Sequence, residues 1–313
     1  MTADSAAPAP EAGGDHYDVV IIGGGPAGLS TGLNLVRARR RVLILDSNRP
    51  RHSATLISHG FLTRDGVSPL ELRALGREEF SGYPTAEFHQ GLVDAIEPVG
   101  EAGAGAEAPA DADGSGYAAP ATVTTVPAGF VVTSRGVRGS ADRRVTAPVV
   151  VIATGLAETL PALPSIRAYY GTSLHSCIEC DGFEKGDEAL ALIGETADLA
   201  ERAVLVSQVT DDLIVFTNGS AAVTPVEEAA LRARGIRVER GALADVVGDR
   251  SGLTGVALAD GTVVARTGGF VRPLWSVPLP FAAALDLELD AEGHVLVDDR
   301  GATSVPGVYA VGD

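Results

Sequence analysis

A glycine-rich turn between an apolar run and a helical stretch limits the fold of this chain more than any other feature. Residues 19–22 are short, wholly apolar and β-branched, which is typical of a strand buried in a parallel sheet. Gly23, Gly25 and Gly28 follow in the spacing G-x-G-x-x-G, and residues 29–39 have a helical pattern. The first glycine permits a tight turn, the second lets the backbone approach a pyrophosphate, and the third allows helix and strand to pack closely. This arrangement predicts a dinucleotide-binding unit whose phosphates lie at the positive end of the helix dipole.

An acidic residue at the expected distance makes that prediction more specific. A second apolar run, residues 42–45, ends in Asp46, which lies 18 positions after Gly28. In dinucleotide-binding units, an acid near this position accepts hydrogen bonds from the ribose hydroxyls. A G-x-G-x-x-G motif alone is weak evidence, whereas its place between strand and helix, followed by this acid, is strong evidence.

The chain has only two cysteines, Cys177 and Cys180, and they stand in the run H-S-C-I-E-C-D-G-F that begins at His175. Two thiols at this spacing can form a short, reducible disulfide, and a thiolate attacks another disulfide best when its pKa lies near ambient pH. A zinc site needs about four ligands, and here no second cysteine pair exists while His175 supplies at most a third. A structural disulfide that closes so small a loop contributes little to stability. We therefore interpret the pair as redox-active and predict no metal site.

The charge argues against two classes of partner, and the N-terminal composition argues against a signal peptide. The formal net charge of −17 argues against a nucleic-acid backbone or an anionic membrane surface. Residues 1–15 are rich in Ala, Pro and acids and lack the basic start and apolar core of a signal peptide. No apolar run approaches the ~20 residues needed to span a bilayer. We expect a cytoplasmic protein, in which a Cys-x-x-Cys is catalytic or metal-binding more often than structural.

The remaining sequence predicts a second strand–turn–helix unit and a β-meander. Residues 100–116 are acidic and of low complexity, which predicts a mobile loop inside a domain. Residues 148–152 form a buried apolar run that leads into Ala153-Thr154-Gly155, and residues 190–194 begin the second unit, which residues 198–207 continue as a helix. Further short strands are expected at residues 121–125, 129–133, 213–217, 236–239, 255–258 and 262–265.

Four motifs in order carry a family resemblance: I-I-G-G-G-P-A-G, A-T-G, C-I-E-C-D-G-F and T-S-V-P-G-V-Y-A-V-G-D. From Tyr17 onward the chain resembles the low-molecular-weight thioredoxin reductases and their relatives, within the class II pyridine nucleotide-disulfide oxidoreductases. The resemblance implies an α/β fold of two Rossmann-like three-layer ββα dinucleotide-binding domains, the second inserted into the first. It implies an FAD domain over 16–156 and 268–313, and an NAD(P)H-binding-like domain over 157–267 that carries the Cys pair. Residues 1–15, which precede the resemblance, are predicted to be a disordered N-terminal tail.

The resemblance also assigns cofactor contacts. FAD is the implied cofactor, and the residues that would hold it are Gly23, Gly25, Pro26, Ala27, Gly28 and Asp46 at the ADP half, Thr154 and Gly155 nearby, and Gly312 and Asp313 near the ribityl-pyrophosphate.

Roles for the redox segment come from the same resemblance. Cys180 would face the flavin and Cys177 would be the interchange thiol that meets the substrate. Asp181 would donate or accept a proton, although it could equally cap a helix. His175 is a second acid–base candidate, and a structural role for it is the interpretation we prefer.

The loop of residues 49–65 differs from the usual reductase segment. Its residues His52, His59 and Arg64 are expected near the flavin or the substrate approach. His59 could act as an acid or base near the dithiol, but a hydrogen-bonded loop histidine is the preferred interpretation.

The second turn departs from the family pattern. Where NADPH-dependent relatives have another G-x-G-x-x-A/G, this chain has Gly194-Glu195-Thr196-Ala197-Asp198-Leu199. Residues 216–219, after the next strand, contain no arginine or lysine for a 2′-phosphate. Acids where a phosphate must approach should weaken its binding, so the sequence predicts that the NADPH site is lost.

Three functions follow as hypotheses. The first is an FAD-dependent oxidoreductase that exchanges electrons between its Cys pair and a thioredoxin-like protein or a small-molecule dithiol or disulfide, served by oxygen or a ferredoxin-type donor and not by NADPH. The second is a conventional NADPH–thioredoxin reductase, and the third is a flavin-binding redox sensor without turnover. The resemblance further implies a homodimer and a helix after Gly312-Asp313, so a chain that stops at Asp313 is expected to be a fragment.

Overall fold

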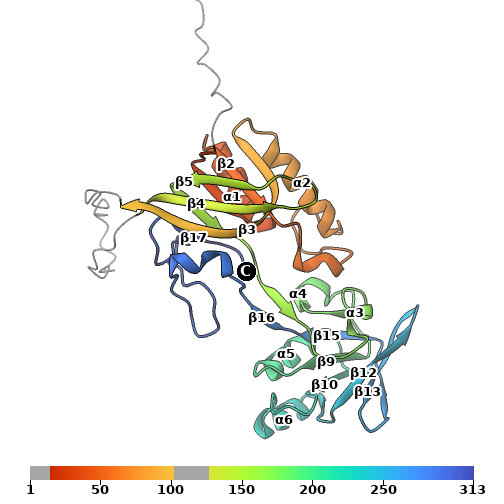
Figure 1. Ribbon diagram of the computed structural model, residues 1–313. Helices are drawn as coiled ribbons and strands as arrows, with labels where there is room; N and C mark the ends of the chain where they lie inside the picture. Colours follow the sequence, from red (N-terminus) through yellow and green to blue (C-terminus); the bar gives the residue numbers. More distant parts are fainter. Residues whose placement is uncertain (1–14, 102–126) are drawn as a thin grey trace, which may run out of the picture. The chain divides into compact units, whose positions relative to one another are not determined.

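The computed structural model describes residues 15–101 and 127–313, which form two compact units (Figure 1). Unit 1 contains the chain up to Asn48 together with Gly76–Gly155 and Leu279–Asp313. Unit 2 contains Arg49–Leu75 and Leu156–Pro278. The tail before residue 15, most of the predicted loop at 100–116 and the predicted strand at 121–125 lie outside the described residues.

Unit 1 is built on a seven-stranded sheet in the order β17-β6-β1-β2-β3-β4-β5. Neighbouring strands from β17 to β3 run parallel, whereas β3, β4 and β5 form an antiparallel meander. The strands are β1 (Val19–Ile22), β2 (Val42–Asp46), β3 (Ala86–Glu101), β4 (Pro127–Gly136), β5 (Arg143–Ala147), β6 (Val149–Ile152) and β17 (Val308–Ala310). The helices around it are α1 (Pro26–Arg37), α2 (Pro69–Ser81, from Gly76 onward) and η2 (Pro280–Leu285).

Alternation of side chains along β1 divides the core of unit 1 into two layers. Val19 and Ile21 pack with Leu29 of α1 and Phe80 of α2 on one face of the sheet. Val20 and Ile22 face the other side, where the meander and η2 cover them. Because β1 is buried on both faces, its run of four apolar residues has no polar position, as the sequence predicts.

Unit 2 is built on a five-stranded parallel sheet in the order β11-β10-β9-β15-β8. Its strands are β8 (Leu174–His175), β9 (Leu190–Gly194), β10 (Leu213–Phe216), β11 (Arg237–Glu239) and β15 (Gly268–Arg272). An antiparallel sheet contains β12 (Leu243–Asp249), β13 (Gly252–Leu258) and β14 (Val263–Ala265), and a two-stranded ribbon pairs β7 (Ala157–Thr159) with β16 (Leu274–Ser276). The helices are η1 (Arg51–Ala54), α3 (Ile166–Tyr169), α4 (Ile178–Asp181), α5 (Leu199–Val206) and α6 (Pro225–Arg232).

The two faces of the central sheet in unit 2 are covered by different elements. Leu190 and Leu192 of β9 pack with apolar side chains of α5 and α6. Ala191 and Ile193 face the opposite side, where β12 and β13 contribute Val246 and other buried residues. Helix and antiparallel sheet thus enclose the parallel sheet, which gives the unit three layers.

The α/β class and the two Rossmann-like units predicted from the sequence are confirmed. One difference concerns the limits of the units, because the predicted FAD domain included residues 268–278. In the structure, β15 is hydrogen-bonded between β9 and β8, with Phe270 opposite Leu192 on one side and His175 on the other. That pairing places β15 in unit 2, which the predicted domain limits did not allow. Within the described residues, no helix is both long and apolar enough to cross a membrane.

Candidate active site

The first turn, between β1 and α1, has open space at its second glycine. A Cβ atom built on Gly25 would meet no heavy atom of the described residues within 4 Å. Gly23 has a φ of +111°, and a Cβ there would lie 2.2 Å from the carbonyl oxygen of Ala153. A Cβ on Gly28 would lie 1.9 Å from the carbonyl oxygen of Gly23. Gly23 and Gly28 are therefore required for packing, whereas Gly25 leaves its side of the turn accessible.

Asp46 lies at the end of β2 beside this turn. It is buried, and its Oδ1 accepts a hydrogen bond from the backbone N–H of Gly24 at 3.2 Å. A Cβ on Gly24 would meet the ring of Phe88 at 2.8 Å, so Phe88 closes the turn from the β3 side. The sequence interpretation missed Phe88, because an aromatic residue in a strand gives no sign of which turn it contacts.

The remaining predicted cofactor residues of unit 1 lie around the same turn. A Cβ built on Gly23 would lie 3.2 Å from Cα of Thr154, and one built on Gly312 would lie 2.8 Å from Cβ of Ala27 in α1. Gly155 has a φ of +66° and open space where a Cβ would stand. Three separate segments therefore meet at the start of α1.

The start of α1 suits a phosphate. Pro26 opens the helix, its first turn carries no acidic side chain, and Gly25 leaves the approach open. Backbone N–H groups and the helix dipole favour an anion at such a position. The residues at this turn fit the pyrophosphate and ribose of a dinucleotide such as FAD.

The two cysteines form a disulfide in unit 2. Cys177 follows β8 and precedes the short helix α4, which contains Cys180. Cys177 is half-buried and Cys180 is exposed. Sγ of Cys177 lies 3.7 Å from Oε2 of Glu179. A dithiol or disulfide from outside can therefore reach the pair.

The structure brings His175 and Asp181 together beside the disulfide. Nδ1 of His175 lies 2.9 Å from Oδ1 of Asp181, and Nε2 of His175 lies 2.9 Å from the carbonyl oxygen of Thr172. The side chains are 9% and 16% exposed, so bulk water is largely excluded from their contact. Asp181 is the last residue of α4 and makes no N-terminal cap, which removes the alternative that its side chain caps a helix start.

A second polar group contacts Ser176, the residue before Cys177. The hydroxyl of Tyr170 donates to Oε2 of Glu158 at 2.7 Å and also contacts the side chain of Ser176. Burial and the hydrogen bond to Glu158 raise the pKa of Tyr170 above its ordinary value. Tyr170 is therefore a neutral hydrogen-bonding group, and no pattern in the sequence pointed to it.

The loop of residues 49–65 contacts the segment after the disulfide. Nε2 of His59 lies 3.4 Å from Oε1 of Glu184, and Nδ1 lies 3.5 Å from Oδ1 of Asp65. Arg64 donates to the carbonyl oxygen of Thr63. The side chain of His52 lies outside the described part of the chain. His59 is thus a loop histidine at ion-pair distance from two carboxylates, one of them in the segment after α4.

The second turn, between β9 and α5, is occupied by its own side chains. Oδ2 of Asp198 lies 2.6 Å from Nη2 of Arg272, and Oδ1 accepts from the hydroxyl of Thr196 at 2.6 Å. A Cβ on Gly194 would meet Cβ of Arg272 at 2.8 Å. Glu195 accepts from the amide of Asn218 at 2.7 Å. Burial raises the pKa of Asp198, but the bonds from Thr196 and Arg272 outweigh it, so the pKa lies below its ordinary value.

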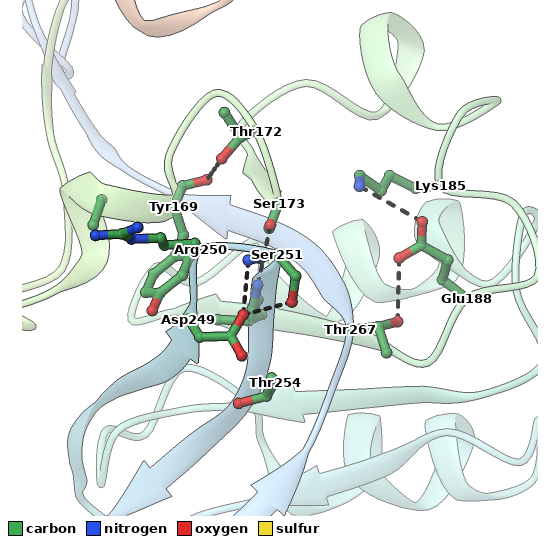
Figure 2. Close-up of a pocket in the computed structure, with 13 residues that line it drawn as sticks. Tyr169, Thr172, Ser173, Lys185, Glu188, Asp249, Arg250, Ser251, Thr254 and Thr267 are labelled. Atoms are coloured by element: carbon green, nitrogen blue, oxygen red, sulfur yellow. Dashed lines mark hydrogen bonds and ion pairs between the residues drawn. The ribbon is translucent and has the colours of Figure 1, made fainter.

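A pocket of about 980 Å³ lies elsewhere in unit 2 (Figure 2). It is lined by Ser173, Glu188 and Thr267, which precede β8, β9 and β15, so it opens at the amino ends of these parallel strands. Within it Lys185 pairs with Glu188, which also accepts from Thr267, and Asp249 accepts from Ser251. Ligands of doubly wound sheets bind at the carboxyl ends of the strands, where the disulfide and Arg272 lie, so the pocket is not part of the candidate active site.

Comparison with known proteins gives a consistent family. Residues 17–313 match the model of the pyridine nucleotide-disulphide oxidoreductase family. A protein of Arthroderma benhamiae named "Probable thioredoxin reductase" is 32% identical over 212 residues, which cover 67% of this chain but only 46% of that relative's length. The thioredoxin reductase of Mycolicibacterium smegmatis is 26% identical over 310 residues, covering 95% of this chain and 88% of that protein. The crystal structure of HlmI superposes with a TM-score of 0.78 at 36% identity, covering 95% of this chain and 84% of that one.

Proposed function

This chain belongs to the pyridine nucleotide-disulphide oxidoreductase family, and from that premise we propose that it is an FAD-dependent enzyme that exchanges electrons between Cys177–Cys180 and an external dithiol or disulfide. The relatives are thioredoxin-reductase-like oxidoreductases, a group that normally binds FAD. One observation carries the proposal. The chain has both an exposed disulfide and a glycine turn with open space where a dinucleotide would bind.

The first turn supports the cofactor assignment. Gly25, the N-terminus of α1 and the buried carboxylate of Asp46 would hold the ADP half, while Thr154, Gly155 and Gly312 border the same turn. Bound FAD would supply a two-electron acceptor or donor that equilibrates with the disulfide. The chain's own task is to present the disulfide and to handle the protons of the exchange.

The disulfide half of the reaction follows from the exposure of the pair. A thiolate of the partner attacks one sulfur, the bond between Cys177 and Cys180 breaks, and a mixed disulfide forms. The partner's second thiolate then closes the partner's disulfide and leaves the enzyme as a dithiol. By family resemblance Cys177 is the sulfur attacked and Cys180 the leaving thiolate; a disulfide substrate would run the steps in reverse.

The second turn supports an electron donor or acceptor other than NADPH. Asp198 and Glu195 place two carboxylates where a pyrophosphate would approach, and Arg272, which could attract one, is already paired with Asp198. An anion would have to displace that pair and also overcome the charge of Glu195. Two kinds of enzyme fit this turn: an oxygen-dependent dithiol oxidase and an enzyme served by a ferredoxin-type donor.

Steady-state turnover tests this function. FAD-loaded protein is supplied with dithiothreitol and oxygen in one assay, and with NADPH and a disulfide dye in the other. Oxygen uptake with the dithiol and no dye reduction by NADPH is the expected result. Dye reduction by NADPH would favour a conventional thioredoxin reductase, and no turnover in either assay would favour a redox sensor.

Cysteine variants test the roles of the two sulfurs. C177S should leave a thiolate at Cys180 and give a long-wavelength charge-transfer absorbance with the flavin, whereas C180S should abolish that band. The reverse pattern would exchange the two roles without removing the redox function. The homodimer and the cytoplasmic location stay predictions.

Exposed apolar side chains near the disulfide support a partner with an apolar surface. Phe183, three residues after Cys180, is 92% exposed, and Leu62 in the loop that contacts Glu184 is 88% exposed. A thioredoxin-like protein and an apolar small-molecule dithiol both meet that description.

A further inference from the structure

The pocket at the amino ends of β8, β9 and β15 has the size of a small-molecule site (Figure 2). Its volume of about 980 Å³ lies at the upper end of the range for such sites. Its walls come from residues 168–173, from Lys185 and Glu188, from the turn of residues 249–254 between β12 and β13, and from Thr267. Of its 13 lining residues, ten have polar or charged side chains, which favours a polar ligand.

Arg250 is a cation of this pocket that the protein itself does not engage. Among the residues that the structure describes, Arg250 forms neither a hydrogen bond nor an ion pair. The turn that presents it has a defined geometry, because the backbone N–H of Ser251 donates to Oδ1 of Asp249 at 2.7 Å and Gly252 has a φ of +134°. A guanidinium offers five N–H donors and no acceptor. The ligand group that suits Arg250 is therefore an anion.

Lys185 and Ser173 bring two further donors to the same pocket. Nζ of Lys185 lies 3.6 Å from Oε1 of Glu188, which is an ion-pair contact but too long for a hydrogen bond. Ser173 is 8% exposed, and its Oγ accepts from the backbone N–H of Leu253 at 3.2 Å. Within the described part of the chain, the O–H of Ser173 has no acceptor. A buried hydroxyl without an acceptor is costly, and a ligand that accepts from it removes that cost.

The two carboxylates of the pocket have hydrogen-bond donors of their own. Oε2 of Glu188 accepts from the hydroxyl of Thr267 at 3.1 Å, and Oδ1 of Asp249 accepts from both the backbone and the hydroxyl of Ser251. Neither carboxylate depends on Arg250 for a hydrogen bond. An anion can therefore bind to Arg250 without leaving a carboxylate of the pocket unsatisfied.

We propose that this pocket binds a small-molecule anion, a phosphate monoester or a carboxylate, through Arg250, Lys185 and the hydroxyl of Ser173. The site goes beyond the proposed dithiol–disulfide exchange, because it lies at the amino ends of the parallel strands, whereas Cys177 follows the carboxyl end of β8. Ser173 directly precedes β8, and Lys185 follows α4. The ligand thus binds away from the reacting sulfurs but contacts both ends of the segment that carries them.

Titration with two probe anions, glycerol 3-phosphate and citrate, tests the site. The FAD-loaded protein is used, so that the glycine turn of unit 1 is already occupied, and the ionic strength is kept constant with sodium chloride. Isothermal titration calorimetry should show saturable binding of at least one probe with a Kd of about 1 mM or lower. Tighter binding of glycerol 3-phosphate would identify the ligand as a phosphate monoester, and tighter binding of citrate would identify it as a carboxylate.

Variants of the two cations test the assignment. R250Q and K185Q should each weaken the bound probe by at least about tenfold, the lower range for loss of a hydrogen bond to a charged group. R234Q is the matched control, because Arg234 is an exposed arginine of the same unit that does not line the pocket. R234Q should bind both probes with wild-type affinity.

Hydrogen–deuterium exchange locates the bound anion. The probe should protect backbone amides of residues 168–173 and 249–254 and leave those of residues 194–199, at the second turn, unchanged. The inference is overturned if neither probe binds saturably, if R250Q and K185Q bind as the wild type does, or if protection is confined to the second turn. None of these results bears on the disulfide exchange, which is tested with dithiols.

Discussion

Each unit of the chain contains a buried parallel strand that runs through a turn into a helix, but the two turns are built from different side chains. In unit 1 the turn leaves open space at Gly25 and its acid, Asp46, stands at the side, bonded to a backbone N–H. In unit 2 the acid Asp198 stands at the helix start itself and pairs with Arg272. The two turns share their backbone topology. They differ in whether a phosphate would find open space and a positive charge that is not already paired with a carboxylate.

This comparison separates fold from function within one molecule. A Rossmann-like unit places a helix N-terminus at the carboxyl end of a strand, which is the geometry of a phosphate site. In the second turn Asp198 and Glu195 place two carboxylates there, and the nearby Arg272 and Arg202 are already paired with Asp198. The fold alone thus does not establish a nucleotide site, and the side chains of the turn decide it.

The largest expected effect concerns the open turn. Gly25→Val should leave the fold intact, because no described atom lies within 4 Å of the new Cβ, but its side chain would occupy the space in which phosphate must meet the backbone. We expect FAD affinity to fall by at least about 100-fold, equivalent to about 2.7 kcal/mol. Flavin absorbance of the purified protein and its titration with FAD measure the effect.

Gly28→Ala is the contrasting variant of the same turn. Its Cβ would overlap the carbonyl oxygen of Gly23, so the protein should lose stability as well as cofactor. A Gly25→Val protein that retains FAD at wild-type affinity would contradict the assignment of this turn.

The next test asks whether the second turn binds NADPH in the wild-type protein. With Asp198 and Glu195 at the turn, excess NADPH should bleach the flavin at least about tenfold more slowly than an equal concentration of dithiothreitol, and NADH should be no faster. That factor corresponds to about 1.4 kcal/mol in the barrier. Anaerobic stopped-flow mixing with the oxidised enzyme measures both rates, and fast bleaching at micromolar NADPH would make the two turns functionally alike.

The sequence predicted the strands at both turns better than it predicted the side-chain contacts within the turns. The apolar runs at residues 19–22 and 190–194 are strands with those bounds, because buried parallel strands are continuous apolar runs. The G-x-G-x-x-G spacing identified the first turn because Gly23 and Gly28 meet local steric demands and Gly25 leaves space beside the backbone. Local patterns of this kind can be read from neighbouring residues alone.

Contacts between distant segments could not be predicted in that way. Arg272 is the last residue of β15, whose position between β8 and β9 is set by tertiary pairing, so its contact with Asp198 has no signal in the sequence. The contact of Tyr170 with Glu158 is of the same kind. The sequence indicated His175 and Asp181 as candidates because they flank the cysteines, but their mutual contact depends on how α4 follows β8.

A smaller effect is expected from opening the second turn. Asp198→Asn removes the charge that holds Arg272 and keeps nearly the same shape. Without that pair, Arg272 becomes available to a phosphate, and we expect the affinity for NADPH to rise by about tenfold, or about 1.4 kcal/mol. Isothermal titration of NADPH, and of 2′-phospho-ADP-ribose to exclude hydride transfer, measures the change.

Asp212→Asn is the matched control for that variant. Asp212 pairs with Arg266 at 2.7 Å in the same unit, but it precedes β10 and so lies at the amino ends of the parallel strands, opposite the second turn. Loss of the Asp212 charge should not change the affinity for NADPH. Equal nucleotide affinity in D198N and the wild type would show that Asp198 does not keep the turn closed.

The smallest effect is the contribution of the Asp198–Arg272 pair to stability. The pair is partly exposed, so its loss in D198N should lower the free energy of unfolding by about 1 kcal/mol at pH 7, the upper range for such pairs. Because the pKa of Asp198 is lowered in the folded state, this stabilisation is present above the unfolded-state pKa of about 3.9 and is lost as the pH falls through the lower folded value. Urea unfolding of D198N, R272Q and the double variant at several pH values gives the coupling energy directly. The coupling should be constant from pH 7 to about pH 5 and decline below about pH 4; a coupling that stays constant below pH 4 would mean that the carboxylate is not the group that occupies the second turn, and the contrast with the open turn at Gly25 would then need another cause.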